Sequence, residues 1–256
     1  MAMRIAVCVK RVPITGGRIV LTDDTRAINT QHLGFTISPH EECGVEEAVR
    51  LIEANRGDSV VLTLGPPEAV EQLRDAMALG IDRAIHVQTG GEEWDAEATA
   101  AALLDAIRAD EAANAPFDIV IFGNESADSG GFQVGIRVAY ALRRPCVTGL
   151  KKVTLEGSSV RCEQEVEGGR DVYVVPLPAV LTVKEGLNLP RYPSVPGRMR
   201  ARSKPVAVTT PVRPDPRLEL VRLSVPPGQG RRAESLGAGP AAAPAVVDIL
   251  AKAGVL

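Results

Sequence analysis

Short runs of apolar, mostly β-branched residues alternate with amphipathic helical patterns up to about residue 145, and this alternation constrains the fold more than any other feature. Apolar residues spaced i, i+3, i+4 and i+7 predict helices that include residues 45–52 and 100–107, each with one face to pack on a sheet. Strands and helices in this order predict a mostly parallel α/β sheet. The expected buried strands are residues 4–9, 59–65, 83–87 and 118–123.

Further helices are expected along residues 68–79 and 133–143. The helix that includes residues 45–52 has a clear start signal, because residues 38–41 read Ser-Pro-His-Glu and offer a capping box with proline in the first turn. Before it, strand-like residues 18–21 and 27–29 flank a turn and predict a hairpin.

Beyond Pro145 the pattern changes to strands joined by glycine-rich turns, which predicts an antiparallel extension of the sheet. The expected strands are residues 147–155, 160–166, 171–175 and 179–183. Residues 205–240 show little periodicity and precede a short predicted helix at 245–253. This tail cannot build a core of its own, so it is either a disordered extension or an arm that becomes ordered on another protein. We therefore divide the chain into a domain at 1–204 and an arm at 205–256.

Composition excludes several classes of protein. The net charge of −3 and an aromatic content of 3% disfavour nucleic-acid binding, which needs basic grooves and stacking rings. Proline or charge interrupts every apolar run before the ~18–20 residues of a membrane span, and the run at residues 5–9 is too short for a signal peptide. The four cysteines are far apart, which predicts reduced thiols and a cytoplasmic protein without a metal site.

Ligands of such sheets bind beyond the carboxyl ends of the strands, which directs attention to the glycine-rich loop at residues 123–135. The residues alone leave two readings open: an anion-binding turn at a helix start, or an ordinary loop capped by Asp128 or Ser129. P-loop, dinucleotide and nucleophile-elbow motifs are absent, and no catalytic acid–base pair or histidine partner stands out. His86 is expected to be structural. A binding or carrier subunit is therefore favoured over an enzyme.

A series of motifs in order resembles the β subunit of electron transfer flavoprotein. The resemblance covers about residues 4–204 and the final helix, and it rests on residues 8–13, 38–42, 45–51, 64–66, 76–84, 123–135 and 187–196. It implies a Rossmann-like, adenine-nucleotide α-hydrolase-like fold in a heterodimer, with the arm packed on an α subunit that holds most of the FAD. It further implies that flavin dehydrogenases donate electrons, that a quinone reductase or similar acceptor receives them, and that this subunit binds AMP.

The resemblance also implies which residues line the nucleotide. They are Cys8, Ser38, Pro39, His40, Glu41, Leu64, Gly123, Asp128, Gly130, Gly131, Phe132, Gln133, Val134 and Gly135. Residues 132–135 read Phe-Gln-Val-Gly where the family often has Asn-Gln-Thr-Gly, and this ending resembles the electron-bifurcating branch, whose β subunit binds a second FAD and meets NADH. AMP and FAD therefore both remain open. Thr15 and His40 replace aromatic residues that contact the flavin in the family.

Residues 187–204, here called the docking segment, resemble the recognition loop through which the family binds dehydrogenases. The residues expected to take part are Arg191, Tyr192, Val195, Pro196, Arg198, Met199 and Arg200, with Val195 as the apolar anchor. Without the resemblance, an exposed basic loop is the simpler reading. Two other classes stay open: an interaction protein, and a stand-alone ATP-binding domain, although residues 128–131 do not match the Ser-Gly-Gly-x-Asp-Ser order of the latter.

Overall fold

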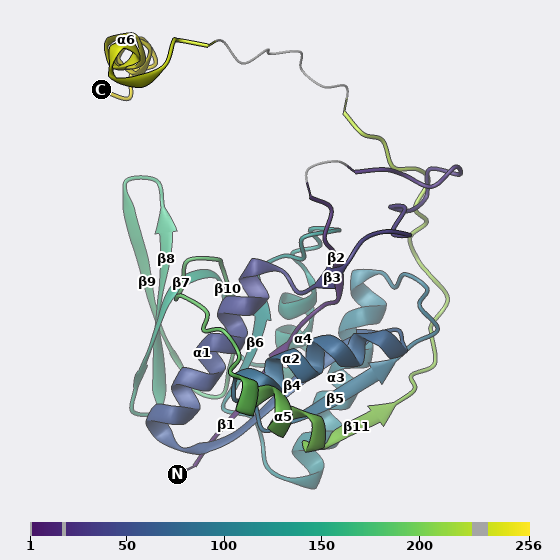
Figure 1. Ribbon diagram of the computed structural model, residues 1–256. Coiled ribbons are helices and arrows are strands. Elements are labelled where there is room, and N and C mark those ends of the chain that lie inside the picture. Colours follow the sequence, from purple (N-terminus) through teal and green to yellow (C-terminus); the bar gives the residue numbers. More distant parts are fainter. Residues whose placement is uncertain (1, 17–18, 227–234) are drawn as a thin grey trace.

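A single large sheet is the frame of the molecule in the computed structural model, which describes residues 2–16, 19–226 and 235–256. Its strands are β1 (Met3–Cys8), β4 (Gly57–Gly65), β5 (Arg83–Gln88), β6 (Ile119–Gly123), β7 (Cys146–Glu156), β8 (Ser159–Val166), β9 (Gly169–Pro176), β10 (Ala179–Val183) and β11 (Val206–Thr209). Within the described ranges these nine strands are ordered β11-β5-β4-β1-β6-β10-β7-β8-β9 (Figure 1).

Most of the sheet is parallel, and only the β7-β8-β9 end is antiparallel. All eight strands predicted for the sheet form within two residues of their expected bounds. The predicted α/β class with an antiparallel extension is therefore confirmed.

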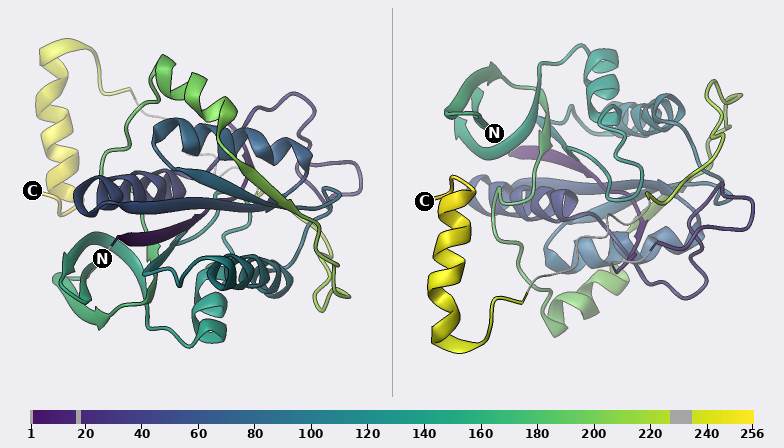
Figure 2. Two further views of the ribbon diagram at one scale, coloured as in Figure 1. Left: turned by 90° about the horizontal axis from the view of Figure 1, so that it is seen from below. Right: turned by 90° about the horizontal axis from the view of Figure 1, so that it is seen from above.

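The helices cover both faces of the sheet. They are α1 (Pro39–Asn55), α2 (Val70–Leu79), α3 (Ala96–Ala113), α4 (Val134–Leu142), α5 (Val195–Ser203) and α6 (Ala243–Lys252), with 3-10 turns at Pro67–Ala69 and Gly239–Ala242. Helices α1 and α2 pack in one apolar core with one face of the sheet, while α3 and α4 form a second core with the other face (Figures 1 and 2). Each core is built from the apolar stripes that the helical periodicity predicts.

The order in which successive strands are added to the sheet reverses at β1. From β1 the chain passes through α1 to β4 and through α2 to β5 on one side, and α3 then leads back to β6 on the other side of β1. This makes the carboxyl ends of β1 and β6 the topological switch point, where open α/β sheets bind ligands.

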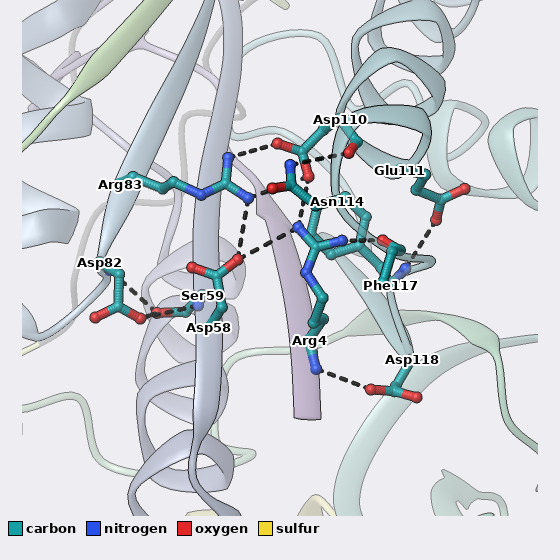
Figure 3. Close-up of polar contacts among 11 residues, drawn as sticks. Arg4, Asp58, Ser59, Asp82, Arg83, Asp110, Glu111, Asn114, Phe117 and Asp118 are labelled. Carbon is teal, nitrogen blue, oxygen red and sulfur yellow. Dashed lines mark hydrogen bonds and ion pairs between the residues drawn. The ribbon is translucent and has the colours of Figure 1, made fainter. Parts of the chain in front are cut away.

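At the opposite, amino-terminal edge of the same strands, four charged side chains form a closed network (Figure 3). Arg4 Nη2 lies 2.6 Å from Asp110 Oδ1, and Arg83 Nη1 lies 2.5 Å from Asp110 Oδ2. Asp58 Oδ2 accepts from both guanidinium groups, at 3.3 and 3.0 Å. Arg4 also stacks on Phe117, 4.4 Å from the ring centroid. These charges neutralise one another and tie β1, β4 and β5 to α3.

Four short elements were not predicted. Strands β2 (Val12–Pro13) and β3 (Phe35–Thr36) pair in a separate small sheet. Helix α5 lies inside the docking segment, and β11 pairs with β5 inside the predicted arm. The sheet therefore continues to Thr209, beyond residue 204 where the predicted domain ends. The predicted hairpin is reduced to one antiparallel bridge, Leu21 to Ile28, and its Arg18 lies outside the described residues.

Helix α6 lies apart from the sheet and its covering helices (Figures 1 and 2). Val247, Ile249 and Leu250 on this helix are exposed. No helix in the described part of the chain combines the length and the apolar character required to cross a bilayer.

Candidate functional site

The first part of the candidate site is the start of α1, which is held against the loop after β1. Ser38 and Glu41 form the predicted capping box, in which Glu41 Oε2 accepts from the Ser38 N–H at 2.9 Å. The other carboxylate oxygen of Glu41 accepts from the Lys10 N–H, also at 2.9 Å. Burial raises the pKa of the Glu41 carboxyl to about 8, against the effect of both hydrogen bonds. Glu41 thus fixes the backbone of two segments.

Gly123, at the end of β6, allows α1 to approach this strand closely. A Cβ atom on Gly123 would lie 2.7 Å from Glu41 Cγ, which no side chain tolerates without a shift. Beside it, His40 joins two further loops: its Nδ1 accepts from the Glu185 N–H at 2.7 Å, and its Nε2 lies 3.2 Å from Glu125 Oε1. His40 therefore carries its hydrogen on Nε2.

The second part of the site is the loop between β6 and α4. Lys10 Nζ lies 2.7 Å from Asp128 Oδ2 and 3.2 Å from Glu93 Oε1, so the loop after β1 holds this loop in place. Burial opposes the charge on Lys10, but Glu93 and Asp128 outweigh burial and hold the pKa of the amine above its usual value. Burial likewise opposes the charge on Asp128, while Lys10 brings the pKa of that carboxyl below its usual value.

Helix α4 begins without the capping side chain or acidic residue that commonly compensates the positive end of a helix dipole. Gln133 at its N-cap makes no side-chain capping hydrogen bond, and the first turn contains no acidic residue. Just before it, Gly130 adopts φ +60°, and a Cβ atom on Gly131 would meet nothing within 4 Å. Backbone N–H groups and the positive end of the helix dipole at such a start favour an anion.

The structure brings most of the predicted nucleotide residues to the switch point, but their side chains are not equally available. The Cys8 thiol is buried in the core, which raises its pKa, so only its backbone can face a ligand. Ser38 is fully buried. Leu64 is half-buried at the end of β4 and packs on the α3/α4 core, whereas Phe132 is exposed and has a positive φ of 48°. His86 is buried as expected, with Nε2 3.1 Å from the Gly65 carbonyl oxygen.

Sequence reasoning missed four polar residues that hold these loops together. They are Lys10, Glu93, Glu125 and Glu185. Lys10 directly follows a buried strand and Asp128 follows another, so opposite charges at neighbouring strand ends were a signal for that ion pair. Glu125 and Glu185 meet His40 from distant segments, and no spacing in the sequence indicates that contact.

The docking segment is attached to α1 by an arginine clasp. The Arg191 guanidinium pairs with Glu46, at 2.9 Å from Nε to Oε2, and with Glu53, at 2.7 Å from Nη1 to Oε1. Both carboxylates, through their hydrogen bonds, raise the pKa of Arg191. The Asn188 amide also donates to Glu47 Oε2 at 3.0 Å. Arg191 therefore faces the body of its own chain.

The rest of the docking segment is helical where a loop was predicted. Ser194 caps α5 by accepting from the Gly197 N–H at 3.1 Å, and Pro196 lies in the first turn, so the sequence did contain a helix start. Val195 is 73% exposed and Met199 is 67% exposed. The side chains of Tyr192, Pro196, Arg198 and Arg200 are exposed as well. Val195 and Met199 thus form a small exposed apolar surface on a capped helix, with basic residues around it.

Comparison with known proteins gives a consistent result. A sequence model described as the electron transfer flavoprotein domain matches residues 25–213. An electron transfer flavoprotein subunit beta from Syntrophomonas wolfei is 35% identical over 232 residues, which covers 90% of this chain and 88% of that protein. The human subunit beta is 34% identical over 210 residues, covering 82% of each chain.

A third relative, from Acetobacterium woodii, is a subunit of a caffeyl-CoA reductase-Etf complex and is 32% identical over 211 residues, covering 80% of this chain and 78% of its own. The residues matched by the family model, 25–213, include the strands from β4 to β11, the loop between β6 and α4, and the docking segment. The chain therefore belongs to the electron transfer flavoprotein β-subunit family.

Proposed function

We propose that this chain is the β subunit of a heterodimeric electron transfer flavoprotein that carries electrons from flavin dehydrogenases to a downstream quinone reductase or similar acceptor. Family membership and the names of the relatives support this role. The exposed apolar residues of α6, which lies apart from the sheet, also fit a partner subunit that covers this helix. FAD held mainly by the α subunit supplies the electron chemistry, and this chain helps to bind, position and shield that flavin.

We further propose that an adenine nucleotide, AMP, binds at the switch point with its phosphate at the start of α4. The observation that carries this proposal is the uncapped, acid-free first turn of α4 behind the open backbone of Gly130 and Gly131. The first turn of α4 fits a phosphate because its N–H groups have neither a side-chain cap nor an acidic residue beside them, whereas the Gly130 N–H already donates to the Ser126 carbonyl oxygen at 3.1 Å. Glu41 and Lys10 hold the surrounding loops, and the exposed Phe132 and half-buried Leu64 remain available to the rest of the ligand.

A second FAD in place of AMP is the alternative nucleotide. The Phe-Gln-Val-Gly sequence at residues 132–135 favours it, because this ending resembles the electron-bifurcating branch of the family. FAD in this subunit would accompany an electron-bifurcating role with NADH as the donor.

The test is to coexpress the chain with the α-type subunit of the same organism and to identify what the purified complex contains. A yellow heterodimer that releases one FAD and one AMP on denaturation supports the proposal, and two FAD molecules support the alternative. A colourless chain that forms no complex would contradict the electron carrier role. Released ATP would favour a stand-alone ATP-binding domain.

The docking segment is proposed to bind the dehydrogenase, with Val195 as its anchor. One exposed apolar residue on a capped helix offers limited contact area, and the nearby Arg198 and Arg200 raise the encounter rate more than the affinity, which suits a transient partner. Val195→Asp should therefore slow electron acceptance from the dehydrogenase and leave bound flavin unchanged. Val166→Asp, on the β8–β9 hairpin, is the matched control. Equal rates for the two variants would remove the docking role.

A further inference from the structure

The arm does not leave the sheet freely after β11, because two arginines attach it to the carboxyl edge. Arg213 Nη2 donates to the Glu93 carbonyl oxygen at 2.7 Å, in the loop after β5. Arg217 Nη1 lies 3.0 Å from Glu97 Oε1, in the first turn of α3. Farther along, the Leu223 N–H donates to the Thr25 carbonyl oxygen at 2.7 Å. In Figure 1 this part of the chain rises from β11 along that edge to the early loop.

The same two acidic residues also contact basic residues that lie next to the proposed phosphate loop. Glu93 Oε1 binds Lys10 Nζ at 3.2 Å, and Lys10 in turn binds Asp128. The other oxygen of the Glu97 carboxylate, Oε2, lies 3.8 Å from Arg137 Nη1.

Arg137 belongs to α4, and its Nη2 donates to Gln133 Oε1 at 3.1 Å. Glu93 and Glu97 thus each contact the arm and one basic residue, and these basic residues, Lys10 and Arg137, in turn contact Asp128 and Gln133 before α4.

We propose that Arg213 and Arg217 strap the arm across the carboxyl edge, and that seating of the arm and binding of an anionic nucleotide at the start of α4 favour one another. The inference rests on the nucleotide site proposed above. A bound phosphate attracts Lys10 and Arg137. Because Arg137 and Arg217 both pair with Glu97, drawing Arg137 toward the phosphate lessens the repulsion between these two arginines. In return, a seated arm adds two positive charges beside the anion.

The coupling is reciprocal, because any factor by which the seated arm strengthens nucleotide binding must equally strengthen arm seating when the nucleotide is bound. Its size follows from the exposure of the groups: Arg217 and Glu97 are 76% and 47% exposed in their side chains. Ion pairs in such positions are weak, so we expect a factor of about two to five for the pair of arginines together.

The experiment uses the full-length chain and the double substitution Arg213→Ala with Arg217→Ala. The matched control is Arg202→Ala with Arg222→Ala, which removes the same charge from two exposed arginines outside the strap. Calorimetry measures the affinity for AMP, and limited proteolysis with subtilisin measures cleavage within residues 210–226, with and without AMP.

The strap variant should bind AMP about two- to fivefold more weakly than the control. It should also be cut faster within the arm and lose the protection that AMP gives. Equal affinity and equal cleavage in the two variants, with AMP still bound, would overturn the proposed coupling through Arg213 and Arg217 but not the nucleotide site. Failure of the unsubstituted chain to bind AMP or FAD would overturn the nucleotide site and, with it, the coupling.

Discussion

The two ends of the parallel strands use charged residues in opposite ways. At the amino-terminal edge, Arg4, Asp58, Arg83 and Asp110 satisfy one another in a closed network (Figure 3). At the carboxyl edge, Lys10 and Asp128 pair between loops, and the neighbouring start of α4 has no acidic partner. The first arrangement can only stabilise, whereas the second leaves backbone donors for a ligand. Stability and binding are thus placed on separate edges of one sheet.

Asp110→Asn should break the stabilising edge. Because the Arg4 and Asp110 side chains are only 11% and 6% exposed, removing the Asp110 carboxylate leaves two guanidinium groups with little water and only Asp58 to share. We expect a loss of about 3 kcal/mol in the free energy of unfolding, measured by urea denaturation. Asp105→Asn, at an exposed position on the same helix, should have little effect. A large loss of nucleotide affinity in Asp110→Asn without unfolding would contradict the separation.

Gly135→Ala should show that the carboxyl edge depends on close backbone packing. A Cβ atom there would lie 2.9 Å from Thr182 Cγ2 and 3.2 Å from Phe122, so α4 must move away from the sheet. The expected cost is about 2 kcal/mol in thermal or urea unfolding. Gly131→Ala, where a Cβ atom meets nothing within 4 Å, is the control and should unfold like the unsubstituted chain. Equal losses in both variants would exclude the packing explanation.

The two edges should respond to pH in opposite directions. The ionised form of Glu41 is disfavoured in the folded state, where its pKa is about 8 instead of 4.5, so its contribution to stability is lost as pH rises from about 4.5 to 8. Burial works against ionisation of Asp110, but Arg83 and Arg4 hold its pKa below 3.8, so its contribution is lost only as pH falls below that value.

Unfolding free energies measured from pH 3 to 9 would separate the two groups. Glu41→Gln should remove a slope of at most about 1.4 kcal/mol per pH unit between pH 5 and 8. Asp110→Asn should leave that slope and weaken the decline in acid. A Glu41→Gln variant with the original slope would rule out Glu41 as its source.

Lys10→Met should give the smallest effect and act on binding. Without the amine, Asp128 and Glu93 repel each other and the loop before α4 loses its tie to β1, so AMP affinity should fall about fivefold, as measured by calorimetry. Lys152→Met, in an ion pair with Glu163 on the β7–β8 hairpin, is the control and should bind normally. Unchanged affinity in Lys10→Met would show that the loop is held by its backbone alone.

The sheet was predictable from sequence because buried strands and amphipathic helices repeat a local pattern. The same pattern located the carboxyl edge of the sheet, at which the start of α1 and the loop after β6 lie against each other. The missed elements have other origins: β11 is only four residues long and depends on pairing with β5, and α5 follows its capping residue without an apolar stripe. Long-range polar contacts, such as His40 with Glu185, depend on how the loops fold together and have no local signature.

The arginine clasp on α1 also determines how the docking segment responds to salt. Glu46 and Glu53 cancel the charge of Arg191 within the chain, and Arg198 pairs with Asp75 at 3.4 Å, so an approaching protein senses chiefly Arg200 and Arg202. Screening by dissolved ions acts only on the field that extends into the solvent. Association with the partner should therefore slow less with rising ionic strength than the number of arginines suggests. The shape of the apolar surface at Val195 and Met199 then contributes more to partner specificity.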